Sequence, residues 1–279
     1  MKKYIIYTLL TLFLTSMIFF GVKAYDEAKA YEKVTFDLVE QMSPQKLAEF
    51  QLKELAETFS LGLYKNEKKK NLEKIRMLGE EHKKRGQAYT LYFILLLLGI
   101  LGSYFLLTLR AFTFFGSLAS LVTLVFGLIT PIMMVTIHKE VEYLGDVVLS
   151  FESKSVIGSI SKLFENGDAV VALVILLFSV LIPTVKILSL LFVSVFMKSK
   201  FAHGMVTFFK MIGKWSMVDV FVVATFLVYL TVDKGEVSRA EVEVGLYFFL
   251  AYVIVSMLVS LSADKMLHLD KIKSKNLSS

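Results

Sequence analysis

Hydrophobic and polar residues follow one another in long blocks along this chain. Six apolar blocks reach the length of about 20 residues that crosses a hydrocarbon core of about 30 Å. They cover approximately residues 4–22, 89–109, 112–137, 169–197, 211–231 and 244–262. The pattern predicts an all-α fold, a polytopic membrane helix bundle of about six transmembrane helices.

A long polar segment, residues 23–88, separates the first two predicted spans. Apolar residues recur there at helical spacing, and "SPQKLAEF" offers Ser43 as an N-cap before Pro44. We expect two or three amphipathic helices outside the cytoplasm, and a helical pack that supports the anchors is favoured over a dedicated binding module. The first block, followed by "VKA" at Val22–Ala24, also fits a secretory signal, but its length favours an uncleaved anchor.

The second and third blocks are separated only by "LRAF" around Arg110, which predicts a tight hairpin. Three parts follow from this division. They are an N-terminal transmembrane hairpin with its helical insert at 1–109, a four-helix membrane domain at 110–265 and a basic tail at 266–279.

The distribution of basic residues predicts the orientation in the membrane. Lysine and arginine are concentrated at the N-terminus, at Arg110, in the loop after residue 197 and in the tail, whereas loops 138–168 and 232–243 are mainly acidic. The positive-inside rule therefore predicts that both termini are cytoplasmic. The basic "HKKRG" at His82–Gly86, on the opposite side, is an exception to this pattern.

The composition supports a membrane protein and argues against several other classes. The chain has 279 residues, 56% of them hydrophobic, with a net charge of +6 that lies beside the apolar blocks, so nucleic-acid binding is not indicated. It has no cysteine, and its four histidines are not at metal-ligand spacing. No nucleophile has a neighbouring base. We therefore expect no enzyme activity, no catalytic residue, no metal and no cofactor.

The fourth predicted span, "FSVLIPTVKILSLLF" at residues 178–192, contains both a helix breaker and a charge. Pro183 cannot donate a backbone hydrogen bond to the carbonyl of Ser179, so we expect a distorted helix there. Ser179, Pro183 and Lys186 fall on one helix face, with Ser189 toward its edge. A lysine at this depth costs about 2.5–3.5 kcal/mol unless it faces protein, water or an opposite charge.

Asp219, in the fifth predicted span, is the expected counter-charge of Lys186. Thr130 and Pro131 interrupt the third span near its outer end, which suggests an interior seam shared by three helices. Two interpretations remain open. One is an ion pair that only fixes helix packing, and the other is a polar cavity that contacts a ligand.

The segments that contain these residues resemble a known protein family. "SVIGSISKLFENGDAVVALVILLFSVLIPTVKILSLLFV", a basic loop and "IGKWSMVDVFVVATFLV" together resemble the paraquat-inducible protein A family, over roughly residues 111–265. Thr130 and Pro131 resemble the family's proline near the end of its first helix. The positions that match the family motif are Pro183, Lys186, Gly213, Trp215, Ser216, Met217, Asp219 and Phe221. On physical grounds alone, Trp215 is also typical of an aromatic anchor at the membrane surface.

The chain departs from this family in two respects. Family members typically carry cysteine-pair zinc ribbons and often two membrane domains, whereas this chain has no cysteine and one such domain. Residues 1–109 take the place of the zinc ribbon in the sequence, so a function of the ribbon in the family is not expected of this chain.

The resemblance implies an inner-membrane component of an envelope phospholipid transport system, working with membrane lipids and a periplasmic MCE-domain protein. The polar seam would then receive a lipid headgroup, with Lys186 opposite its phosphate. Two alternatives remain. The protein could be a scaffold that docks a periplasmic partner in an envelope stress response, or a proton-coupled transporter of a small solute.

Overall fold

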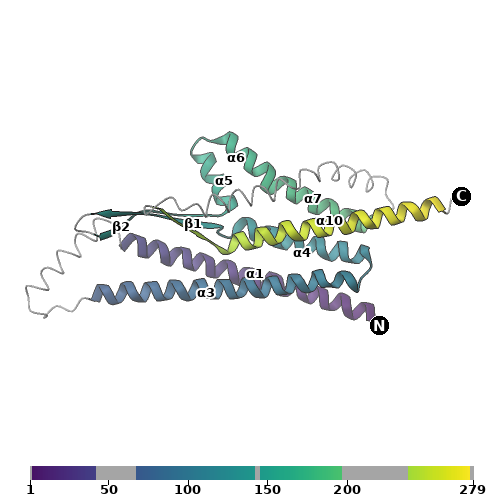
Figure 1. The fold of residues 1–279 in the computed structure, drawn as a ribbon, viewed down its shortest axis with the longest axis horizontal. Helices are drawn as coiled ribbons and strands as arrows, with labels where there is room; N and C mark the ends of the chain where they lie inside the picture. Colours follow the sequence, from purple (N-terminus) through teal and green to yellow (C-terminus); the bar gives the residue numbers. More distant parts are fainter. Residues whose placement is uncertain (1, 42–66, 142–144, 197–237, 277–279) are drawn as a thin grey trace, which may run out of the picture.

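The computed structural model describes residues 2–41, 67–141, 145–196 and 238–276. These residues form an elongated bundle, with a small β-sheet at one end and both ends of the chain at the other (Figure 1). Five helices within the described ranges are long and apolar enough to cross a membrane. The expected membrane helix bundle is therefore confirmed. The predicted span at 211–231 lies outside the described residues.

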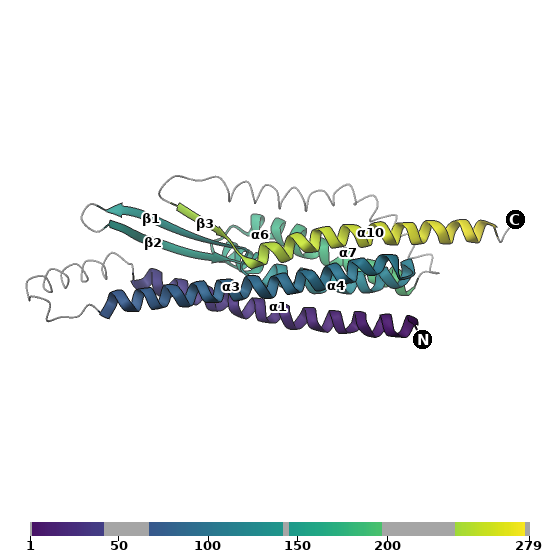
Figure 2. The same ribbon diagram turned by 60° about the horizontal axis from the view of Figure 1, so that its bottom comes forward.

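The N-terminal hairpin consists of α1 (Lys2–Gln41) and α3 (Glu67–Gly102), which pack side by side and run in opposite directions (Figure 2). Leu10, Met17, Phe93 and Ile100 are buried between these helices and the rest of the bundle. The 40 residues of α1 measure about 60 Å at 1.5 Å per residue, which is twice the hydrocarbon thickness.

The separate amphipathic helices expected in the insert are not found in its described parts. Residues 23–41 continue α1 and residues 67–88 belong to α3, so each membrane helix extends without a break beyond the bilayer. Ala24 and Ala28, one turn apart, are buried and keep the two helices in contact. Ser43 and Pro44 lie outside the described residues.

The third membrane helix is shorter than predicted. A 3-10 turn, η1 (Ser103–Phe105), leads to α4 (Leu109–Ile129), whose first turn carries Arg110. The predicted span at 112–137 was wrong beyond Ile129, because Thr130 precedes a proline and adopts the extended conformation that this position favours.

The chain then enters a three-stranded antiparallel sheet of order β2-β1-β3, which the sequence pattern did not predict. The strands are β1 (Met133–Val141), β2 (Gly145–Lys154) and β3 (Ser238–Val242). Ile132 donates its N–H to the carbonyl of Lys154 (2.8 Å), and Glu243 donates to the carbonyl of Ile132 (2.8 Å). The sheet is thus hydrogen-bonded to the ends of the membrane helices.

The fourth crossing is composite. After the short amphipathic α5 (Val156–Glu165), the chain runs through α6 (Ala169–Ile175), a π-helical segment η2 (Leu176–Leu181) and α7 (Ile182–Val195). The N–H of Ile182 donates to the carbonyl of Leu177, five residues earlier. The irregularity expected around Pro183 takes the form of this wider π turn.

The last helix, α10 (Val244–Asn276), packs along α4. Two glycines of α4 permit this contact. A Cβ atom on Gly116 would lie 2.6 Å from Val259, and one on Gly127 would lie 2.9 Å from the backbone of Phe249. Small residues are the usual means by which membrane helices approach closely.

Replacing Gly127 by alanine should therefore destabilise the protein. The added methyl group would meet the backbone of α10, and overpacking of this kind typically costs about 1–3 kcal/mol. We expect a lower unfolding temperature in detergent for Gly127→Ala. Gly102→Ala is the matched control, since nothing lies within 4 Å of its added Cβ. Equal unfolding temperatures for the two variants would contradict this account of the contact.

Candidate functional site

A line of small hydroxyl residues runs along the face of α4 that points into the bundle. Its members, which we call the hydroxyl seam, are Thr113, Ser117, Ser120 and Thr123, all fully buried. Their spacing of three or four residues places them on one side of the helix. Each hydroxyl donates to a carbonyl four residues earlier in α4, at 2.7–2.8 Å. These bonds satisfy the hydroxyl protons in a region without bulk water.

Lys186 projects from α7 into the same interior. Its side chain is 8% exposed, and its Nζ lies 3.5 Å from the Oγ of Ser256 on α10. Ser256 in turn donates to the carbonyl of Val253 (3.0 Å). The expectation that this lysine faces protein rather than lipid is therefore met in the structure.

The other residues singled out in the fourth span have different environments. Pro183 and Ser189 are buried on the same side of α7 as Lys186, and Ser189 donates to the carbonyl of Val185 (2.7 Å). Ser179 lies in the π-helical segment and is half-buried. The proline, the lysine and one serine thus share a buried face, and Ser179 lies at its margin.

Hydroxyl groups of α10 complete the polar interior. Ser256 and Ser262 are both buried, and the Oγ of Ser262 lies 3.4 Å from the Oγ1 of Thr113. Three helices, α4, α7 and α10, therefore direct polar side chains toward one another in an otherwise apolar bundle. A buried ammonium group requires such neighbours.

The tryptophan motif cannot be placed in this arrangement. Asp219, the expected counter-charge, lies outside the described residues, so its pairing with Lys186 stays a prediction. The same holds for Gly213, Trp215, Ser216, Met217 and Phe221.

Thr130 and Pro131 lie at the junction between the bundle and the sheet. The N–H of Gly245 donates to the carbonyl of Pro131 (2.8 Å), and Thr130 is fully buried beside it. Ser256, the contact of Lys186, is eleven residues further along α10, about 16 Å at 1.5 Å per residue. These two residues therefore mark the outer end of the α4–α10 interface.

A buried carboxyl group at this junction was missed by sequence reasoning. Glu243 is 3% exposed, and among the described residues its Oε1 has no hydrogen-bond partner. Burial raises the pKa of Glu243 from 4.5 to about 7, and the charge of Lys83 and the Val244 N–H counteract this only in part. Its sequence position between two valines, directly before an apolar block, was the available signal.

The basic segment at residues 82–86, which departs from the positive-inside pattern, pairs with acidic residues close to Glu243. Lys83 of α3 forms an ion pair with Glu241 (2.5 Å), and Tyr31 of α1 donates its hydroxyl to the same carboxylate (3.3 Å). His82 contacts Glu27 at 2.6 Å. These basic side chains thus join α1, α3 and the sheet outside the apolar part of the bundle.

The raised pKa of Glu243 predicts a pH-dependent stability. Because the folded state binds this proton more tightly than the unfolded state, stability should fall as pH rises from about 4.5 to about 7 and then level off. Glu243→Gln should remove this dependence and raise stability at pH 8 by on the order of 3 kcal/mol at most. Unfolding temperatures in detergent at pH 5 and pH 8 measure both effects.

Glu81→Gln is the control for this prediction, because Glu81 is exposed and bonds to Arg85 on its own helix. An unchanged pH profile in Glu243→Gln would show that the proton is bound elsewhere.

No group of three or more candidate metal ligands occurs in the described part of the chain.

The fold and this interior define a class: a polytopic membrane protein whose helices enclose a polar seam around one lysine. The model of the paraquat-inducible protein A (PqiA) family matches residues 111–273, more than half of the chain, so the protein belongs to this family. The match begins in the first turn of α4 and ends within α10. The hairpin of α1 and α3 therefore lies outside it.

One curated relative is similar over part of the chain. It is described as a probable intermembrane transport protein of Haemophilus influenzae and is 27% identical over 119 residues, which cover 40% of this chain. The aligned region covers only 28% of that relative's length. No solved structure matches this chain.

Proposed function

We propose that this protein is the inner-membrane component of an envelope phospholipid transport system, and that the interior around Lys186 receives the lipid headgroup. The observation that carries the proposal is the burial of Lys186 beside Ser256, in a bundle whose α4 also buries the hydroxyl seam. A phospholipid suits such an interior, because its phosphate is an anion that can reside among hydroxyl groups while its acyl chains stay in hydrocarbon.

The chemistry of the seam suits a headgroup. The Lys186 ammonium supplies a positive charge and rotatable donors. Each serine or threonine hydroxyl now donates within its own helix, but it retains acceptor lone pairs that can bind an amine or hydroxyl of the headgroup. The interior thus offers a positive charge for the phosphate and hydrogen-bond acceptors for the rest of the headgroup.

The outer end of the molecule is the proposed docking surface for a periplasmic MCE-domain protein. The sheet and the outer parts of α1 and α3 lie at the end opposite both described termini (Figure 1). In this proposal the termini are cytoplasmic, so the sheet would face the periplasm. The name of the Haemophilus relative, an intermembrane transport protein, supports this arrangement.

Lys186→Met separates the headgroup role from a packing role. Methionine keeps a similar length and removes the charge. If Lys186 only paired with a buried carboxylate, its loss would leave that carboxylate uncompensated and destabilise the protein by about 3–5 kcal/mol. We expect this variant to insert and fold normally but to co-purify with at least about tenfold less phospholipid per protein, because an interaction with a charged group is worth about 1.5–3 kcal/mol. Phospholipid is quantified by mass spectrometry after purification in mild detergent.

The matched control is Lys265→Met, which removes an exposed lysine of α10. Asp219→Asn should also reduce co-purified lipid if this carboxylate positions Lys186. A folded Lys186→Met variant that retains its full lipid content and restores the envelope barrier in cells lacking the protein would leave only the ion-pair interpretation.

A further inference from the structure

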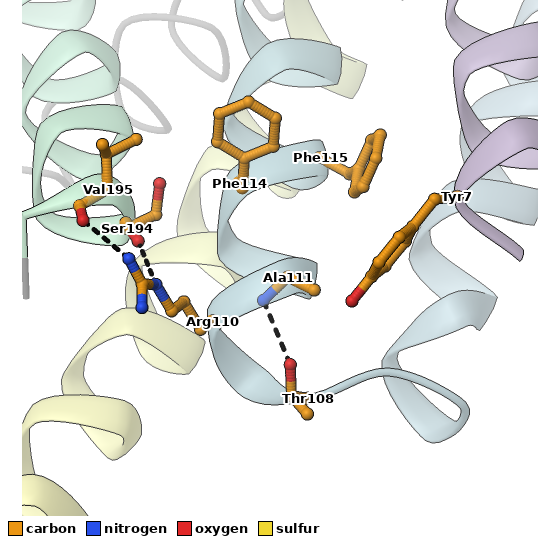
Figure 3. Close-up of a pocket in the computed structure, with 8 residues that line it drawn as sticks. All are labelled: Tyr7, Thr108, Arg110, Ala111, Phe114, Phe115, Ser194 and Val195. Atoms are coloured by element: carbon orange, nitrogen blue, oxygen red, sulfur yellow. Dashed lines mark hydrogen bonds between the residues drawn. The ribbon is translucent and has the colours of Figure 1, made fainter. Parts of the chain in front are cut away.

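A second polar feature lies at the end of the bundle that carries both described termini. It is a pocket of about 350 Å³ between α1, α4 and α7 (Figure 3). Its lining residues are Tyr7, Thr108, Arg110, Ala111, Phe114, Phe115, Ser194 and Val195. Along α7, Ser194 is eight residues from Lys186, about 12 Å, so the pocket is distinct from the surroundings of Lys186.

Arg110 is held in a fixed orientation at the edge of this pocket. Its Nε donates to the carbonyl of Ser194 and its Nη2 to the carbonyl of Val195, both at 2.7 Å (Figure 3). These carbonyls end α7 and have no partner within that helix, so the guanidinium caps the helix and meets the negative end of its dipole. The two bonds use two of five N–H donors, and Arg110 is otherwise exposed.

The remaining walls are suited to an amphiphile. The pocket adjoins the first turn of α4, where the helix dipole favours an anion, and Thr108 accepts the N–H of Ala111 there. The Tyr7 hydroxyl points toward this turn (Figure 3). On the other side, Phe115 stacks on Tyr7 with ring centroids 5.8 Å apart. One part of the pocket is therefore cationic and the other aromatic.

The adjoining turn indicates the depth of the pocket in the membrane. Phe105 and Leu106, in the connection between α3 and α4, are 87% and 73% exposed. Two neighbouring large apolar side chains of this kind are favourable at the boundary between headgroups and acyl chains. Arg110 follows four residues after Leu106 and so lies at headgroup depth.

We propose that this pocket is a binding site for the phosphate of an anionic phospholipid in the leaflet on the side of the termini. The guanidinium of Arg110, already fixed by α7, presents its remaining N–H groups to the phosphate, while Tyr7, Phe114 and Phe115 contact the glycerol and upper acyl chains. The site is separate from the headgroup site around Lys186 and does not depend on transport.

Binding of short-chain lipids to the purified full-length protein in detergent tests this site. The probes are dioctanoylphosphatidylglycerol, dioctanoylphosphatidylcholine and inorganic phosphate, and the readout is the dissociation constant from thermal-shift titration. We expect the anionic lipid to bind more tightly than the zwitterionic lipid, and inorganic phosphate to bind far more weakly than either. Arg110→Gln should weaken binding of the anionic lipid by about tenfold or more, because it removes charge-assisted bonds.

Arg110→Gln also removes the cap of α7 and could reduce lipid binding by destabilising that helix. A second variant therefore tests the pocket without changing the cap. Ala111→Leu fills the pocket while leaving the bonds of Arg110 to α7 in place, and it should weaken lipid binding to a similar extent. Because the proposed site around Lys186 also binds phospholipid, all titrations are made in the Lys186→Met background, so that the remaining binding reports on the pocket. Unchanged lipid binding in Ala111→Leu, or equal affinity for inorganic phosphate, would overturn the assignment to a lipid.

Discussion

The close backbone contact between α4 and α10 is the constraint on which the rest of the described structure depends. Gly116 and Gly127 leave room for Val259 and Phe249, and Gly245 lies directly against the carbonyls of Thr130 and Pro131. At this short distance between the helices, hydroxyl groups of α4 and α10 meet in the interior. The strands that adjoin the two helices also begin at the same level. Larger residues at these positions would separate the helices and expose polar groups to hydrocarbon, where each unsatisfied group is costly.

Hydropathy predicted the membrane spans well because the cost of burying polar groups in lipid acts on every residue of a span. Hydropathy could not predict where these helices end outside the membrane, because a helix that continues into water incurs no such cost. For this reason α1 and α3 are longer than the predicted spans. It also merged β1 with the preceding apolar block, because period-2 alternation beside a long apolar run carries little contrast. Pro131 was noted, but its effect on the helix end was underestimated.

The polar interior was only partly visible in the sequence. Lys186 stands out because a charge in an apolar block is expensive, whereas serine and threonine are nearly neutral in hydropathy, so the seam of α4 was missed. A search for hydroxyls at spacings of three and four would have found it. The sequence around Glu243 carried only a local signal, its position between two valines, because the charges that surround it, such as Lys83, are distant in sequence. Only tertiary structure brings these groups together.

The hairpin of α1 and α3, which precedes the matched family region, has a mechanical consequence. Two long helices packed along their length bend much less readily than one. Within the bundle this pair packs against α4, where Tyr7 stacks on Phe115 and Gly21 lies against Phe126, and outside the bundle Lys83 pairs with Glu241. The inner contact is tight packing and the outer one is a half-exposed ion pair that is weak in water. A force applied to the end of this stiff pair near the sheet is therefore transmitted to the C-terminal part of α4, where Phe126 lies.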